Sequence, residues 1–280
     1  MVLVVRPTTL DVHFHYEILE RASRLDGDSF VDFRLGYVTG ATADDAVAFV
    51  EGIAKARKKG IPRTILQFGP STRPSPLSNP GPHAWAKGFT LRRYSHAQDA
   101  KDVCEQLKGL RGIGILSAGG HGEPEGVAHG LRGAEIRAAK LELFPALYFS
   151  GPCYCGVPGR WYKPERGLYV ENTVPSSESF LLALIGAGAT GVFAGLDPDR
   201  GETNHRERED VIAGSTLGEA SKNTYDDVVL AYRRKALVLP RYVVGKRAPF
   251  RDIHDNMISG AACRALFGLP TFRPFPSTEE

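Results

Sequence analysis

Two short glycine-rich segments carry the residues that could do chemistry. His121 lies between glycines in the run Ala-Gly-Gly-His-Gly, and Cys153 lies in the later run Gly-Pro-Cys-Tyr-Cys-Gly. A thiol attacks a carbonyl as its thiolate, and a nearby imidazole can lower the pKa of the thiol or accept its proton. The same imidazole can then protonate a leaving amine. This pair indicates acyl-transfer chemistry if the fold brings both side chains together.

Such chemistry also needs hydrogen-bond donors for the oxyanion of a tetrahedral intermediate. The backbone N–H groups of Gly122 and Cys153 would serve if both point into one cleft. Gly122 follows the histidine directly, and the absence of a side chain there permits a close approach of another chain segment.

Each of the two segments directly follows a continuously apolar run, at residues 113–117 and 147–150. Continuous rather than alternating apolar residues are typical of strands buried on both faces, as in a parallel sheet covered by helices. The carboxyl ends of neighbouring parallel strands meet at one edge of the sheet, where sites in open α/β sheets lie. We therefore expect His121 and Cys153 on the same edge.

The rest of the chain alternates short apolar strands with amphipathic helices, which predicts an α/β fold. We expect a three-layer α/β/α sandwich with a mostly parallel sheet, in a single domain over residues 1–280. The expected strands are Val2–Val5, Arg63–Phe68, Phe89–Tyr94, Gly112–Ser117, Ala146–Ser150 and Gly191–Ala194. The expected helices are Thr42–Lys58, Ser95–Leu107, Leu131–Leu141, Ser177–Ile185, Ser215–Arg233 and Ile253–Leu266.

Two other interpretations of the same residues stay open. A cysteine after a strand can be a core residue, and a histidine among glycines can be a turn residue. Alternatively, Cys153, Cys155, His121 and His129 offer four nitrogen and sulfur ligands of the kind that zinc prefers. One residue between the cysteines is shorter than the spacing usual in zinc sites, which weighs against that module.

Composition narrows the classes of partner. The chain has 280 residues and a net charge of +3, and its basic residues are dispersed, which argues against nucleic acid as a partner. No apolar run is long enough to cross a membrane. Four cysteines are too few for a disulfide scaffold, and the amino terminus lacks the pattern of a signal peptide, which favours a cytoplasmic location.

The ordered motifs resemble the caspase-like cysteine peptidases of clan CD, and most of all the gingipain-like family C25. That family has an apolar strand ending in His-Gly, then an apolar strand ending in a small residue, Cys, two residues and Gly. Here these are Gly-Ile-Leu-Ser-Ala-Gly-Gly-His121-Gly122 and Leu-Tyr-Phe-Ser-Gly-Pro-Cys153-Tyr-Cys155-Gly156. The Cys-x-x-Gly spacing selects Cys153 rather than Cys155. The resemblance extends over about residues 10 to 275.

The resemblance implies a cysteine-type endopeptidase, that is, a thiol protease that acts on a protein or peptide substrate. It implies Cys153 as the nucleophile and His121 as the general acid and base. The backbone amides of Gly122 and Cys153 would form the oxyanion hole. No cofactor is required for this chemistry. Calcium often stabilises gingipain-like folds, and Asp26, Asp28 and Asp32 could ligate it, although a solvated turn or helix cap explains these residues better. The family's first strand and helix have no counterpart before Val2, and its members are commonly exported.

Departures from the family pattern affect activity and specificity. Pro152 stands where a small Ala or Ser is usual and removes a backbone N–H beside the site, which suggests a catalytically impaired scaffold as an alternative function. The segment 69–87, where Arg-specific members carry an acidic residue, contains no Asp or Glu. Asp197 and Asp199 follow another predicted strand and could line the substrate pocket, and Trp161 could wall a substrate groove. We expect the charged stretch Asp197–Asp210 to be a mobile or cleavable loop.

Overall fold

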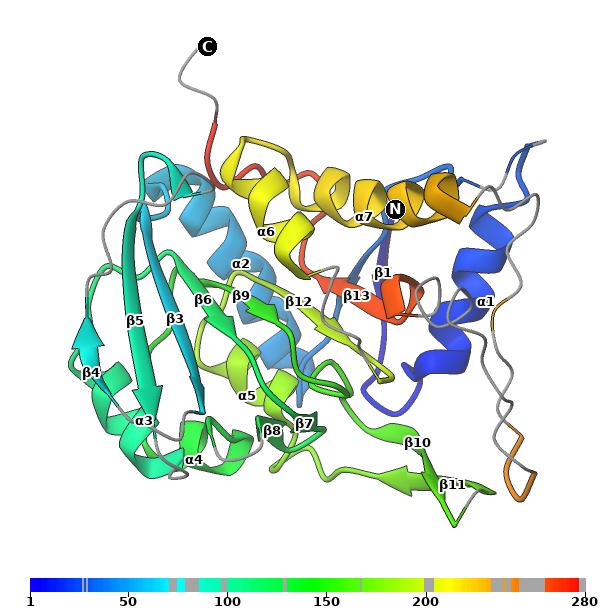
Figure 1. Ribbon diagram of the computed structural model, residues 1–280, viewed down its shortest axis with the longest axis horizontal. Helices are drawn as coiled ribbons and strands as arrows, with labels where there is room; N and C mark the ends of the chain where they lie inside the picture. The colour runs from blue at the N-terminus through cyan, green and yellow to red at the C-terminus, as the bar shows by residue number, and fades with distance from the viewer. Residues whose placement is uncertain are drawn as a thin grey trace.

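The computed structural model describes residues 1–26, 28, 30–70, 75–78, 86–96, 100–127, 130–166, 168–198, 204–232, 239, 243–246 and 260–276. Within these residues the centre of the molecule is a nine-stranded sheet (Figure 1). In spatial order its strands are β1 (Val2–Val4), β2 (Gly36–Val38), β13 (Arg264–Phe267), β12 (Gly191–Gly195), β9 (Leu147–Ser150), β6 (Ile115–Ala118), β3 (Thr64–Pro70), β5 (Thr90–His96) and β4 (Ser75–Ser78).

The sheet is mostly parallel but contains two blocks of opposite direction. Strands β12, β9, β6, β3 and β5 are parallel to one another and form what we call the forward block. β13 pairs antiparallel with β12, and β2 and β1 follow β13 in parallel, which makes β13, β2 and β1 the reversed block. The amino end of β13 therefore lies at the same edge of the sheet as the carboxyl ends of the forward strands.

Helices cover both faces of the sheet, which confirms the three-layer α/β/α architecture (Figure 1). One layer contains α2 (Ala43–Lys59), α3 (Ala100–Lys108), α4 (Gly133–Ala138) and α5 (Phe180–Gly186), in which α2 contacts α5, α5 contacts α4 and α4 contacts α3. The other contains α1 (Val12–Ala22), α6 (Asn204–Ile212) and α7 (Leu217–Tyr232). The buried apolar side chains of strands and helices form one core cluster. One such cluster is compatible with the single domain that we expect over residues 1–280, which stays a prediction.

Local sequence signals explain where α2 begins and ends. Thr42 caps it, accepting a hydrogen bond from the backbone N–H of Asp45, whose carboxylate accepts one from the N–H of Thr42. Acidic residues in its first turn and basic residues in its last turn both favour the helix dipole. Gly60 ends it in a conformation with φ of 79° that side-chain-bearing residues rarely adopt.

Two expectations about the carboxy-terminal third were wrong. The helix expected over Ile253–Leu266 gives way at Arg264 to β13, because this short apolar run fills a place between β12 and β2, where every one of its residues is buried. Most of the earlier residues of that expected helix lie outside the described part. The stretch Asp197–Asp210, expected as a loop, contains the first two turns of α6 from Asn204 onward.

Two hairpins that the sequence reasoning missed stand beside the sheet. β7 (Gly122–Glu123) pairs with β8 (Gly126–Val127) directly after the histidine. β10 (Arg160–Glu165) pairs antiparallel with β11 (Leu168–Thr173) after the cysteine segment and projects from the body of the molecule (Figure 1). Both hairpins therefore begin within a few residues of the candidate site.

Candidate active site

The register of β6 and β9 sets the place of the two candidate catalytic residues. The strands are parallel neighbours, and Ala118 of β6 pairs with Ser150 of β9. His121 is three residues beyond Ala118, and Cys153 is three residues beyond Ser150. The two residues therefore leave the same edge of the sheet, at adjacent strands and at the same distance along the chain from a paired position.

Close contact between the two loops supports this placement. A Cβ built on Gly122 would lie 2.7 Å from the carbonyl oxygen of Cys153, 2.7 Å from Sγ of Cys155 and 2.5 Å from Cβ of Pro152. No side chain fits at such distances, so glycine is the residue that lets the histidine loop pack on the cysteine loop. Gly120, with φ of 110°, makes the turn that precedes His121.

The cysteine loop itself turns through a strained residue. Tyr154 has φ of 57°, a left-handed conformation that is uncommon for a residue with a side chain. Its backbone N–H reaches the carbonyl oxygen of Asp197 at 3.5 Å, and its ring packs edge-on against Trp161 with centroids 4.9 Å apart. Strain of this kind persists where the surroundings enforce it, and such residues cluster at functional sites.

The turn separates the two thiols into different environments. Cys153 is partly exposed, whereas Cys155 is fully buried with Sγ 3.7 Å from the carbonyl oxygen of Glu123. His121 is exposed. None of the four cysteines of the chain is in a disulfide. Solvent thus reaches part of Cys153 but not Cys155.

A buried ion pair between Arg264 and Glu207 lies against the carboxyl end of β9. The Arg264 guanidinium donates through Nε and Nη2 to one carboxylate oxygen of Glu207, at 2.9 and 2.6 Å, and through Nη1 to the carbonyl oxygen of Ser150 at 2.8 Å. Both charged side chains are almost completely buried. The pair joins α6 and β13 to the last residue of β9, three residues before Cys153.

Sequence reasoning missed this pair. The available signal was Arg264, the one charge in the run Ala-Ala-Cys-Arg-Ala-Leu-Phe, which a helix interpretation places on a solvated face. Nothing distinguishes Glu207 from the charged residues around it in the sequence. Its burial follows from the way α6 packs over the sheet.

The predicted substrate-binding residues are not all placed at an open surface. Asp197 is 1% exposed, and the hydroxyl of Tyr16 donates to its carboxylate at 3.4 Å. Trp161 is 6% exposed and packs against Tyr154, with the ammonium of Lys163 5.6 Å from its ring centroid. Both residues are thus buried and contact Tyr154 of the cysteine loop, and their part in substrate binding stays a prediction. Asp199 lies outside the described residues.

The suggested metal ligands give no cluster in the part of the chain that the structure describes. Among these residues no group of three or more His, Cys, Asp or Glu could hold a metal ion. Carboxylate oxygens of Asp26 and Asp28 accept hydrogen bonds from the backbone N–H groups of Asp28 and Phe30, as in a turn. Desolvation and the two neighbouring carboxylates raise the pKa of Asp32. His129, the fourth residue of the zinc hypothesis, lies outside the described residues.

Comparisons with known proteins agree on the architecture. No family model matches the chain, and no curated protein matches it either. A solved complex of the pro- and mature domains of Porphyromonas gingivalis RgpB is similar with a TM-score of 0.59 and 13% identity, over 91% of this chain and 60% of that one. This chain has the caspase-like fold of the gingipains. Its expected resemblance to them is thereby confirmed at the level of fold.

Two further structures support the same fold. The crystal structure of the Arg-specific cysteine proteinase gingipain R (RgpB) is similar with a TM-score of 0.54 and 13% identity, over 89% of this chain and 57% of that one. A structure described as a protease has a TM-score of 0.57 and 9% identity, over 91% and 59%. The chain thus spans about 60% of the length of these structures.

The helices bear on the expectation about membranes. In the described part of the chain, no helix combines the length and apolar character needed to cross a bilayer.

Proposed function

We propose that this chain is a cysteine endopeptidase in which Cys153 is the nucleophile and His121 the general acid and base. The observation that carries the proposal is the matched position of the two residues, each three residues past the paired ends of β6 and β9. The gingipain-like fold supports it, because proteins of that fold include cysteine proteinases. The tight contact of Gly122 with the cysteine loop supports it further.

In the proposed reaction His121 accepts the thiol proton of Cys153, and the sulfur attacks the scissile carbonyl carbon. A C–S bond forms, and the carbonyl oxygen becomes an oxyanion that accepts hydrogen bonds from the N–H groups of Gly122 and Cys153. The imidazolium then protonates the amide nitrogen, and the C–N bond breaks to leave a thioester. Water, deprotonated by His121, hydrolyses that thioester and restores the thiol.

Exposure favours Cys153 over Cys155 as the nucleophile. The Cys153 side chain is partly exposed at the edge of the sheet beside an exposed histidine. The Cys155 sulfur is enclosed between Gly122 and the carbonyl of Glu123. We assign Cys155 a positioning role, because its sulfur fills the contact that holds the histidine loop against the cysteine loop.

The burial of Asp197 and Trp161 suggests a similar indirect role for both. Each contacts Tyr154, one through its backbone carbonyl and the other through its ring. In this proposal they hold the strained turn that presents Cys153 to the substrate. Neither a calcium ion nor any other cofactor takes part in the chemistry that we propose.

A positional-scanning peptide library tests the function directly. We expect the wild-type chain to cleave a subset of the library and Cys153→Ala to cleave none of it. Cys104→Ala is the matched control, because Cys104 is buried in α3 and its removal should leave hydrolysis intact. Hydrolysis that survives in Cys153→Ala contradicts the proposal. A folded wild-type chain that labels with a thiol reagent yet cleaves nothing favours the impaired scaffold instead, for which Pro152 is the argument.

A further inference from the structure

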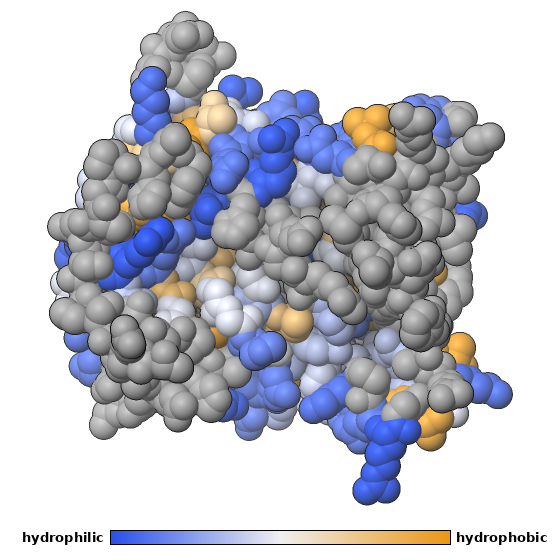
Figure 2. Space-filling view, viewed as in Figure 1, coloured by the Kyte–Doolittle hydropathy of each residue, from blue (hydrophilic) through white to orange (hydrophobic). Residues whose placement is uncertain are grey.

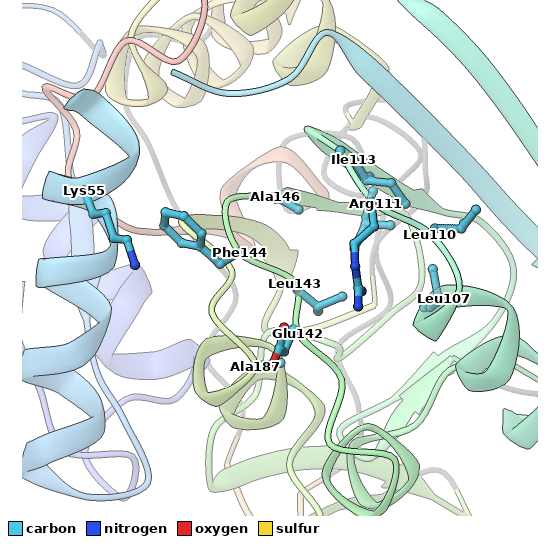
Figure 3. A pocket seen from close by; sticks show the side chains of 12 residues that line it. Lys55, Leu107, Leu110, Arg111, Ile113, Glu142, Leu143, Phe144, Ala146 and Ala187 are labelled. Carbon is cyan, nitrogen blue, oxygen red and sulfur yellow. The ribbon is translucent and has the colours of Figure 1, made fainter. Parts of the chain in front are cut away.

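A cavity of about 320 Å³ lies at the edge of the sheet opposite to Cys153. It is enclosed by α2, by the segments that lead into β6 and β9, and by the end of α5 (Figure 3). The volume is at the lower end of the range of small-molecule sites, roughly 300–1,000 Å³. Its size therefore suits one small ligand or one residue of a peptide.

The lining combines an apolar interior with charged residues. The apolar part includes Leu107, Leu110, Ile113, Leu116, Leu143 and Ala146. Lys55, Arg111 and Glu142 also line the cavity, and all three are exposed. Figure 3 shows the Arg111 side chain running toward Leu143 and Glu142, and Lys55 projecting from α2 toward Phe144.

The three charges of the cavity have no oppositely charged partner among the residues that the structure describes. Within the described residues none of them takes part in an ion pair. Arg111 donates one hydrogen bond through Nη1 to the carbonyl oxygen of Lys108, and the Lys55 ammonium lies 4.9 Å from the ring centroid of Phe144. Two cations and one carboxylate thus face the opening with capacity for further partners.

We propose that this cavity binds an apolar α-amino acid unit, with its side chain in the leucine-lined interior and its α-carboxylate on Arg111. Guanidinium and ammonium groups are the natural partners of a carboxylate, and charge-assisted hydrogen bonds are the strong ones. Glu142 then accepts from the nitrogen of the same unit. A fatty carboxylate fits less well, because it has no donor for Glu142 and its charge would repel that residue.

The same chemistry occurs in a free apolar amino acid and at the carboxyl terminus of a peptide. Both present a carboxylate and an N–H one bond away from the carbon that carries the apolar side chain. The free amino acid carries a positive charge at the nitrogen, so its ammonium group interacts with the Glu142 carboxylate more strongly than the neutral amide N–H of a peptide does. The site is independent of the peptidase proposal, because it lies at the amino ends of the strands whose carboxyl ends carry the candidate catalytic residues.

Methyl-detected NMR titration of the Cys153→Ala chain tests the proposal without interference from hydrolysis. The probes are L-leucine, N-acetyl-L-leucine and L-leucinamide. We expect one of the two carboxylates, or both, to shift the methyl signals of Leu110 and Leu143, and leucinamide to bind at least tenfold more weakly. Tighter binding of L-leucine identifies a free amino acid, and equal or tighter binding of the acetylated probe identifies a peptide carboxyl terminus.

Arg111→Gln should weaken carboxylate binding by at least tenfold, while Lys59→Gln should leave it unchanged. Lys59 is exposed in the last turn of α2 and does not line the cavity, so it controls for loss of net charge. Both variants alter exposed side chains and should fold as the parent does, which the NMR spectrum reports. The proposal is overturned if neither carboxylate shifts the cavity signals, if leucinamide binds as tightly, or if Arg111→Gln binds like Lys59→Gln.

Discussion

The forward and reversed blocks of the sheet contribute different parts of the candidate site. The forward strands β6 and β9 carry His121 and Cys153 just beyond their carboxyl ends, on loops that reach solvent. The reversed strand β13 meets the same edge with its amino end and contributes a buried cation, Arg264, that bonds to the last residue of β9. The candidate catalytic residues thus follow strands of the forward block, and the buried cation that bonds to the end of β9 belongs to the reversed block.

Substitutions in the two blocks should therefore have different consequences. Substitutions at the exposed ends of the forward strands should alter chemistry and spare stability, because these side chains bury little surface. Substitutions in the network around β13 should alter stability first, because they leave charge or polar atoms in a low-dielectric interior. The following variants test that division.

The largest effect is expected from removal of the imidazole. His121→Ala should lower kcat of peptide hydrolysis by about 10²–10⁴-fold, because the proton transfers then lack their acid and base. The free energy of unfolding, measured by urea titration, should stay close to that of the parent, since His121 is exposed. A loss of stability that accounts for the lost activity would contradict the division between the blocks.

Loss of the buried carboxylate should produce the largest change in stability. Glu207→Gln removes the charge that neutralises Arg264 in the interior, and breaking such a pair costs about 3–5 kcal/mol. Urea unfolding measures the change. Glu17→Gln is the matched control, because the Arg21–Glu17 pair is exposed and should contribute less than about 1 kcal/mol. Equal effects of the two substitutions would show that burial of the Glu207 pair has no energetic consequence.

His15 should make stability depend on pH. Its Nδ1 accepts from the hydroxyl of Tyr37 at 2.8 Å and its Nε2 donates to the carbonyl of Arg264 at 3.2 Å, and burial lowers the pKa of His15 to about 4. The unfolded chain takes up a proton near pH 6.5 and the folded chain does not, so stability falls as the pH drops from about 6.5 to 4. The full change is about 3 kcal/mol.

Urea unfolding of His15→Gln between pH 7.5 and 4.5 isolates this contribution. The variant should show a shallower decline with falling pH than the parent. Lys59→Gln serves as the control, because it alters an exposed side chain of α2 and no histidine. An identical decline in His15→Gln and the parent would mean that burial does not lower the pKa of His15.

The smallest effect is expected at the second thiol. Cys155→Ala opens space beneath Gly122 and should lower kcat by about tenfold with little change in KM, less than the ~10²-fold that an ångström of misplacement can cost. Cys155→Ser, which restores a hydrogen-bonding group of similar size, should recover part of the loss. A rise in KM with unchanged kcat would argue instead for a direct contact between Cys155 and the substrate.

The forward block could be predicted from sequence because the local pattern of apolar residues is enough to identify its strands. Leu147–Ser150 and Ile115–Ala118 are continuous apolar runs that end in glycine-containing turns, so both their burial and the place of the following residues follow from the pattern. The strand β13 could not be predicted in this way. Arg264–Phe267 is too short to show a period, and only its place between β12 and β2 makes it a strand.

The supporting contacts of the site were hidden for the same reason. The partners of Arg264 are 57 and 114 residues away along the chain, and no local pattern encodes pairings at that range. The burial of Asp197 depends on Tyr16, a residue of a helix that the sequence analysis did not identify. Sequence order therefore predicted where His121 and Cys153 leave the sheet, and tertiary packing decided which residues support the loops that carry them.

The central claim, that His121 activates the thiol of Cys153 across the β6–β9 boundary, is tested most directly by the rate of iodoacetamide labelling as a function of pH. Peptide mass spectrometry assigns the label to each cysteine in the wild-type chain and in His121→Ala. We predict fast labelling of Cys153 alone at neutral pH, slowed severalfold or more in His121→Ala. A labelling profile of Cys153 that is the same in both proteins would contradict the claim.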